Sequence, residues 1–112
     1  MKTHRLVLTE DLNQYGFLFG GRLLSWADEA GYIAASTGFP NANFVTRGMG
    51  DVAFKKSVTN GEILCFATEL VGQGTTSVRY QITVTAGQSV DEIFQTEITF
   101  VNVSEDGVKR AL

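Results

Sequence analysis

The carboxylate of Asp28 stands in the middle of a segment that predicts a helix. This segment, residues 19–36, opens on Gly20 and Gly21 and continues with mostly apolar or small residues. The residues one helical turn away from Asp28 are also mainly apolar or small: Leu24, Ser25, Gly31 and Tyr32. Partly apolar surroundings strengthen a carboxylate as a base, so Asp28 is a candidate general base or nucleophile. The alternative is a structural carboxylate that a nearby hydroxyl or backbone group satisfies.

The two glycines at the start of this segment predict a place where a ligand oxygen can bind. The first N–H groups of a helix have no helical acceptor, and the positive end of the helix dipole lies beside them. Without side chains, Gly20 and Gly21 allow a ligand to approach these groups closely. The alternative is that the pair only permits tight packing of the helix against a sheet. No βαβ unit surrounds the glycines, so they are not a dinucleotide-binding motif.

The rest of the chain predicts the elements that position this helix. Residues 3–9 alternate as a short strand, and residues 10–16 form a polar loop. The helix is expected to end near Gly38 and Pro40. Four β-rich segments separated by turn residues follow, at 45–54, 62–71, 75–85 and 92–103. One long apolar helix with these strands predicts an antiparallel sheet curled around the helix, in a single α+β domain covering residues 1–112.

Composition excludes several classes of protein. With 44% hydrophobic and 19% charged residues, the chain has the composition of an ordinary globular domain. Its one cysteine and one histidine exclude an internal disulfide and a cluster of soft metal ligands. The net charge of −3 and pI near 5.0 argue against nucleic-acid binding. No apolar run approaches the ~20 residues of a membrane span, and the first ten residues lack a secretory signal, so we expect a cytoplasmic protein.

Four short motifs occur in order along the chain. They are D-L-N-Q-Y-G with F-G-G (11–21), F-K-K-S-V with N-G-E (54–62), G-T-T-S-V (74–78) and F-V-N-V (100–103). Together they resemble the motifs of the hot-dog-fold acyl-CoA thioesterases, in the branch of bacterial and cytosolic acyl-CoA hydrolases. Each motif alone is weak, but their order and spacing extend the resemblance over nearly the whole chain. Two positions depart from the family pattern: Ser57 replaces the usual proline, and Thr75 replaces an arginine that can contact CoA phosphates.

The resemblance implies a hot-dog fold and hydrolysis of an acyl-CoA thioester without a metal or redox cofactor. It assigns Asp28 as base or nucleophile and the Gly20 amide as donor to the oxyanion, with Gly21 the less favoured member of the pair. Asn13 matches a loop asparagine that holds the attacking water or the thioester carbonyl. An Asx turn is the alternative for Asn13. Glu29, next to Asp28, is the fallback base.

The resemblance also implies how substrate is held and how the chains assemble. Lys56 occupies the lysine position of the second motif and is the candidate for binding the CoA phosphates, unless it belongs only to a solvated strand end. Thr76 and Ser77 are candidates to line the pantetheine channel, although threonine is also a common strand residue. The family site lies between subunits, which implies a homodimer, assembled further into a tetramer or hexamer, with Asn13 and Asp28 of one site on different chains.

Two other functions are compatible with such a fold. A non-catalytic acyl-CoA binding or sensing module would bind acyl-CoA without turnover, but the sequence predicts no attached regulatory domain. A hot-dog dehydratase would use a histidine together with an acid, and His4 is far from the motifs in sequence. The thioesterase prediction is therefore preferred.

Overall fold

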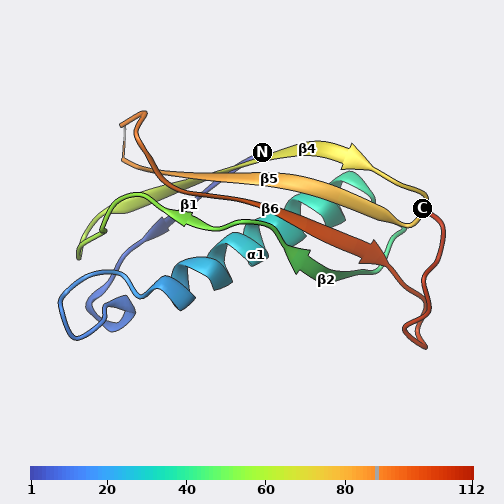
Figure 1. Ribbon diagram of the computed structural model, residues 1–112, viewed down its shortest axis with the longest axis horizontal. Coiled ribbons are helices and arrows are strands. Elements are labelled where there is room, and N and C mark those ends of the chain that lie inside the picture. Colours follow the sequence, from blue (N-terminus) through green and yellow to red (C-terminus); the bar gives the residue numbers. More distant parts are fainter. Residues whose placement is uncertain (88) are drawn as a thin grey trace.

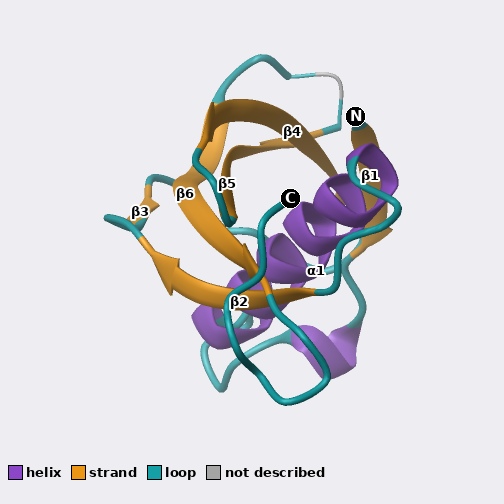
Figure 2. Ribbon diagram, turned by 90° about the vertical axis from the view of Figure 1, so that its right-hand side faces the viewer, coloured by secondary structure: helices purple, strands orange, loops and turns teal. Residues whose placement is uncertain are grey.

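One long helix lies in the hollow of a curled antiparallel sheet (Figure 2). The computed structural model describes residues 1–87 and 89–112. Its elements in chain order are β1 (Lys2–Leu6), the 3-10 turn η1 (Thr9–Asp11), α1 (Gly20–Gly38), β2 (Phe44–Met49), β3 (Ala53–Phe54), β4 (Ile63–Gln73), β5 (Ser77–Ala86) and β6 (Glu92–Asn102) (Figure 1). The strand order is β1-β4-β5-β6-β2, and β3 pairs with β6 beyond the end of β2. The predicted α+β architecture is confirmed.

The helix begins and ends where the sequence predicts. Phe19 is extended, and its carbonyl accepts hydrogen bonds from the N–H groups of Arg22 and Leu23, which closes the first turn. Pro40 follows two residues after the helix ends at Gly38 and cannot continue it. The buried residues recur every three or four positions: Leu23, Trp26, Ala27, Ala30, Gly31, Ala34 and Ala35. Within one chain the sheet therefore covers one face of α1 and leaves Tyr32 and Ile33 exposed on the other.

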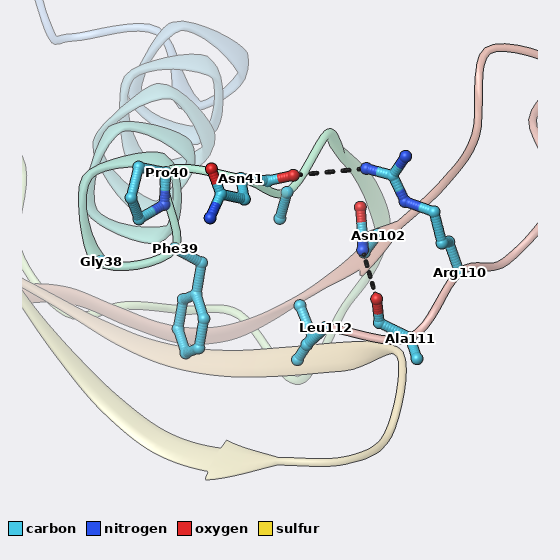
Figure 3. Close-up of a pocket in the computed structure, with 9 residues that line it drawn as sticks. Gly38, Phe39, Pro40, Asn41, Asn102, Arg110, Ala111 and Leu112 are labelled. Carbon is cyan, nitrogen blue, oxygen red and sulfur yellow. Dashed lines mark hydrogen bonds between the residues drawn. The ribbon is translucent and has the colours of Figure 1, made fainter.

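The chain after β6 folds back over the C-terminal end of the helix (Figure 3). The buried side chain of Asn102 organises this segment. Its Nδ2 donates to the carbonyl of Ala111 at 3.1 Å, and its Oδ1 accepts from the Asn43 N–H at 2.9 Å. The Arg110 guanidinium donates to the Asn41 carbonyl at 3.3 Å. Polar contacts thus tie the C-terminal segment to this end of the molecule.

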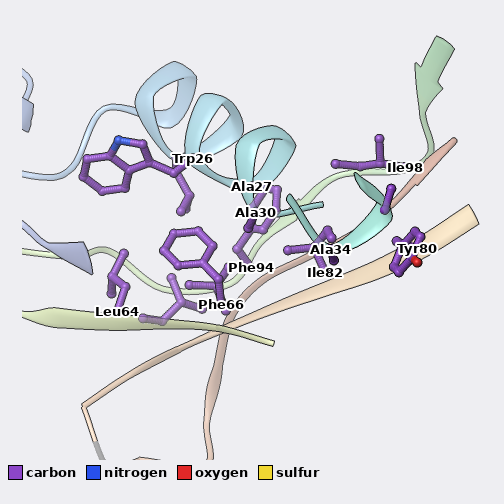
Figure 4. Close-up of a cluster of buried hydrophobic side chains, with 14 of the residues drawn as sticks. Trp26, Ala27, Ala30, Ala34, Leu64, Phe66, Tyr80, Ile82, Phe94 and Ile98 are labelled. Carbon is purple, nitrogen blue, oxygen red and sulfur yellow. The ribbon is translucent and has the colours of Figure 1, made fainter. Parts of the chain in front are cut away.

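The core lies between α1 and the inner face of the sheet (Figure 4). Alternate residues of β5 and β6 point to the same side, because register pairs Val78 with Phe100, Tyr80 with Ile98, Ile82 with Thr96 and Val84 with Phe94. Gly31 lets the helix approach this layer closely. A Cβ at Gly31 would lie 3.0 Å from the Phe100 ring and 3.1 Å from Ile82. The helix position is therefore set by a glycine facing a fully buried aromatic ring.

The predicted strand over residues 45–54 is wrong in its continuity, because the segment forms two strands. β2 carries a bulge between Thr46 and Gly48 and ends at Met49, and β3 holds only Ala53 and Phe54. The Gly50 N–H donates to the Glu97 carbonyl at 2.8 Å at the break. Glycines permit such a bulge and bend in an antiparallel strand. The result is a short, twisted β2 at one edge of the sheet.

Candidate functional site

A cavity of about 360 Å³ opens beside the N-terminus of α1. It brings together Asn13 from the loop before the helix, Gly20 from the first turn and Lys56 from the segment after β3. The ring of Phe54 and the side chain of Ser57 also line it. These residues come from segments far apart in the sequence, so the fold brings three of the predicted site residues together.

Hydrogen bonds of the loop hold Asn13 at this cavity. Asn13 Oδ1 accepts from the N–H groups of Tyr15 at 2.9 Å and Phe17 at 3.1 Å, so Asn13 does form the Asx turn. With the oxygen occupied, the Nδ2 donors are the part of the side chain that can serve a ligand oxygen. The Leu18 N–H donates to the Val58 carbonyl at 2.7 Å, which ties this loop to the segment that carries Lys56.

Asp11, the first residue of the D-L-N-Q-Y-G motif, supports the same loop. Its side chain is buried, and Oδ2 accepts from the Leu8 N–H at 2.9 Å. Its backbone carbonyl accepts from the Phe19 N–H at 3.0 Å, immediately before the helix. Arg22 lies 3.6 Å from the carboxylate. A buried carboxylate therefore anchors the helix N-terminus. The position of Asp11 in the motif does not by itself predict that its side chain is buried.

The amides of Gly20 and Gly21 are available to a ligand. Among the described residues, neither N–H has a backbone acceptor, as expected for the first positions of a helix. A Cβ at Gly20 would lie 3.4 Å from the Phe54 ring, whereas nothing lies within 4 Å of one at Gly21. Gly20 lines the cavity and Gly21 does not. The geometry thus favours Gly20 as the donor that faces a bound group.

Asp28 lies outside this cavity, half-buried on the helix side nearest β2. The hydroxyl of Thr46 donates to Asp28 Oδ1 at 2.7 Å. Thr46 faces the helix because it lies opposite Phe100 of the inner layer. Sequence reasoning missed Thr46, since a threonine in a strand carries no distinguishing local signal. Asp28 is eight residues from Gly20, or about 12 Å along the axis, so one thioester does not contact both within one chain.

Thr76 and Ser77 lie at the opposite end of the sheet. Ser77, the first residue of β5, pairs with Val101 near the end of β6. Lys55, which lines the cavity, donates its N–H to the carbonyl of Ile93 near the beginning of β6. Ile93 and Val101 are eight residues apart on β6, or about 26 Å. The fold therefore does not bring Thr76 and Ser77 to the cavity of their own chain.

Both lysines of the second motif are paired with carboxylates: those of Glu92, the first residue of β6, and Asp91, which immediately precedes it. Lys55 Nζ lies 2.6 Å from Glu92 Oε2, and Lys56 Nζ lies 2.8 Å from Asp91 Oδ2. The hydrogen bond from Lys56, together with its positive charge, lowers the pKa of Asp91 below its ordinary value. All four side chains are substantially exposed. These lysines are therefore positive groups at the cavity that already hold counter-ions.

A second cavity, of about 410 Å³, lies at the other end of the helix (Figure 3). Phe39, Asn102, Arg110 and Leu112 are among the residues around it, and none of the predicted site residues lines it. It is larger than the first cavity but contains no carboxylate side chain and no helix N-terminus. The residues suited to acyl-transfer chemistry therefore gather at the first cavity and at Asp28.

Over residues 1–87 and 89–112, no three His, Cys, Asp or Glu side chains are grouped so that they could hold a metal ion. No helix within the same residues is both long and apolar enough to cross a membrane.

Comparison with known proteins identifies the family. Residues 15–93 match the model of the thioesterase superfamily. The acyl-CoA thioester hydrolase YciA of Escherichia coli K12 is 32% identical, over 96% of this chain and 86% of that protein. The chain therefore belongs to the thioesterase superfamily.

Solved structures agree on the fold. A hexameric hot-dog-fold thioesterase of Campylobacter jejuni is 32% identical and superposes with a TM-score of 0.87, over 98% of this chain and 87% of that one. A hexameric thioesterase of Yersinia pestis is 27% identical and superposes with a TM-score of 0.91, over 98% of this chain and 92% of that one. An acyl-CoA hydrolase of Staphylococcus aureus, solved with butyryl-CoA and CoA, is 26% identical and superposes with a TM-score of 0.87. The match covers 99% of this chain and 67% of that one. The predicted hot-dog fold is confirmed.

Proposed function

We propose that this protein is an acyl-CoA thioesterase. The observation that carries the proposal is the cavity at the helix N-terminus, where the free Gly20 amide and the Asn13 side chain face a space that Lys56 borders. Similarity to the acyl-CoA thioester hydrolase of E. coli and to the acyl-CoA hydrolase of S. aureus supports the choice of substrate. The cytoplasmic location predicted from the sequence stays a prediction.

In the proposed hydrolysis, hydrogen-bond donors lie on one side of the thioester and a base on the other. Asp28 takes a proton from water, and the hydroxide adds to the thioester carbonyl carbon. The oxygen that becomes negative accepts a hydrogen bond from the Gly20 amide at the positive end of the helix. The intermediate then expels the CoA thiolate, which takes up the proton and leaves the free acid. Direct attack by the Asp28 carboxylate, followed by hydrolysis of the anhydride, is the other route that the same geometry allows.

A second copy of the chain completes the site in this proposal. β2 ends one side of the sheet, and Val45 on it is 49% exposed, so this edge is suited to pairing with another strand. Antiparallel pairing of two β2 strands about a two-fold axis sets the two helices side by side in opposite directions. The Gly20 end of one helix then approaches the partner's Asp28. The same arrangement moves Thr76 and Ser77 of one chain toward the partner's cavity, where they can line the pantetheine channel.

Assembly beyond the dimer is proposed from relatives. The similar thioesterases of C. jejuni and Y. pestis are described as hexameric. We extend a dimer-based hexamer to this chain, with the tetramer as the other closed assembly of dimers. Light scattering coupled to size-exclusion chromatography measures the mass directly.

The test compares hydrolysis by wild type with the Asp28→Asn variant across acyl-CoA chain lengths, following thiol release. Losing the base should lower kcat by about 10²- to 10⁴-fold. Glu29→Gln is the matched control, because it removes one carboxylate from the next residue, which is 57% exposed and paired with Arg5. Full activity in Asp28→Asn, or its loss only in Glu29→Gln, would reject the role of Asp28. Saturable acyl-CoA binding without turnover in wild type would instead indicate a binding module.

A further inference from the structure

Two carboxylates occupy the positive groups at the cavity. Lys56 Nζ lies 2.8 Å from Asp91, and Lys55 Nζ lies 2.6 Å from Glu92, both at charge-assisted hydrogen-bond distance. Both pairs join the segment after β3 to the beginning of β6. In Figure 1 this part of β6 and the helix N-terminus lie at the same end of the molecule. An anion that approaches these lysines therefore meets Asp91 and Glu92 as well.

Backbone contacts hold the paired groups in place. The Lys55 N–H donates to the Ile93 carbonyl at 2.7 Å, which aligns the two segments. The Asp91 N–H donates to Ser89 Oγ at 3.1 Å, which orients the residue that carries the carboxylate. The pairs are thus a consequence of strand register and local turn structure.

We infer that Asp91 and Glu92 act as internal competitors of the CoA phosphates for Lys56 and Lys55, and so lower the affinity of the site for CoA. This inference rests on the proposed function. A phosphate that binds these ammonium groups must displace the carboxylates or lie beside them, and both cost binding energy. The pairs are solvent-exposed and therefore weak, so phosphates can replace them.

The competition has a consequence for turnover. Acyl-CoA and the product CoA carry the same phosphates, so phosphate binding that is too strong retains the product after the thioester is cleaved. Competing carboxylates weaken both complexes equally and favour release of CoA. A thioester of pantetheine, which lacks the nucleotide phosphates, should not respond to Asp91 or Glu92.

The test measures CoA binding by isothermal titration calorimetry with wild type, Asp91→Asn and Glu92→Gln. Removing an exposed competing charge should tighten CoA binding by about two- to fivefold in each variant. The gain should shrink at high salt, because exposed charges are screened. Glu69→Gln is the matched control: it removes one carboxylate from an exposed position in the middle of β4, opposite Gln81 of β5 and outside the cavity. Its affinity for CoA should equal that of wild type.

A second variant separates competition from a structural effect. If Asp91 acts through Lys56, the gain from Asp91→Asn should disappear in the Lys56→Gln background. Dephospho-CoA and pantetheine, titrated in parallel, show which phosphate is involved, and pantetheine should bind all variants alike. Unchanged or weaker CoA binding in both Asp91→Asn and Glu92→Gln would overturn the inference, as would an equal gain in Glu69→Gln. CoA binding that responds as expected, without acyl-CoA turnover, would overturn the proposed hydrolysis and leave the inference standing.

Discussion

At the scale of single residues, the hydrogen bond between Thr46 and Asp28 is the contact most open to test. The Thr46 hydroxyl donates to one carboxylate oxygen at 2.7 Å, which orients the side chain and leaves the other oxygen for water or substrate. The bond joins the helix to the edge strand, so it also links Asp28 to the part of the sheet where a partner chain is proposed. Thr46 is thus a positioning residue for Asp28.

Thr46→Val removes this donor while nearly keeping the side-chain shape. Hydrogen bonds to charged groups contribute about 1.5–3 kcal/mol, so we expect kcat to fall by about 10- to 100-fold. KM should change much less, because Thr46 contacts the base and not the cavity. Thr46→Ser keeps the hydroxyl and should retain most of the activity. Equal losses in Thr46→Val and Thr46→Ser would point to a packing defect in place of a lost hydrogen bond.

At the scale of elements, the packing of α1 on the sheet depends on Gly31. A Cβ there would lie 3.0 Å from the ring of Phe100, which is fully buried and makes edge contacts with Tyr32, Phe44 and Tyr80. The ring packs against these neighbours, so either the ring or the helix would have to shift by a few tenths of an ångström. Helix position and ligand cavity are therefore linked, since the same helix carries Gly20 and Asp28.

Gly31→Ala should therefore destabilise the fold. Alanine gains about 1 kcal/mol of helix propensity over glycine, but overpacking a buried layer costs about 1–3 kcal/mol. We expect a net loss of about 1 kcal/mol in urea unfolding. Gly21→Ala is the control, because nothing lies within 4 Å of its added Cβ, and its stability should be equal or higher. Greater stability in Gly31→Ala would mean that the core accommodates the methyl group.

At the level of the whole molecule, the proposed site residues of one chain lie apart. Asn13 and Gly20 lie at one end of the helix, Asp28 lies near its middle, and Ser77 lies at the far end of the sheet. The proposed two-fold pairing of β2 reunites these groups across a subunit boundary. Activity is then a property of the assembly.

Mixing two inactive variants tests this arrangement. Asn13→Asp keeps the acceptor oxygen of the Asx turn but loses the Nδ2 donors, and Asp28→Asn loses the base. If one site takes Asn13 and Asp28 from different chains, a mixed dimer of these variants contains one intact site. Unfolding and refolding an equal mixture should restore about a quarter of wild-type activity, because half of the dimers are mixed and each has one working site of two. No recovery, with dimers formed, would place both residues in one chain.

Most of the elements, and the residues at the helix N-terminus, are predictable from the sequence alone. Apolar spacing and terminal glycines and proline predict α1, and strand alternation predicts the sheet, because these patterns depend on neighbours along the chain. The motifs predict the family, which the comparisons confirm, and they select Asn13, Gly20 and Lys56, which converge on one cavity.

Only the tertiary structure decided which groups face one another. The bond between Thr46 and Asp28 requires the bulged register of β2 on β6, and the pairing of Lys56 with Asp91 requires the segment after β3 to lie beside the beginning of β6. The same register moves Ser77 away from the cavity of its own chain. Strand register couples residues far apart in sequence, and it depends on which strands pair and where they bulge as well as on the pattern of each strand. The partner of each functional group is therefore fixed by the sheet.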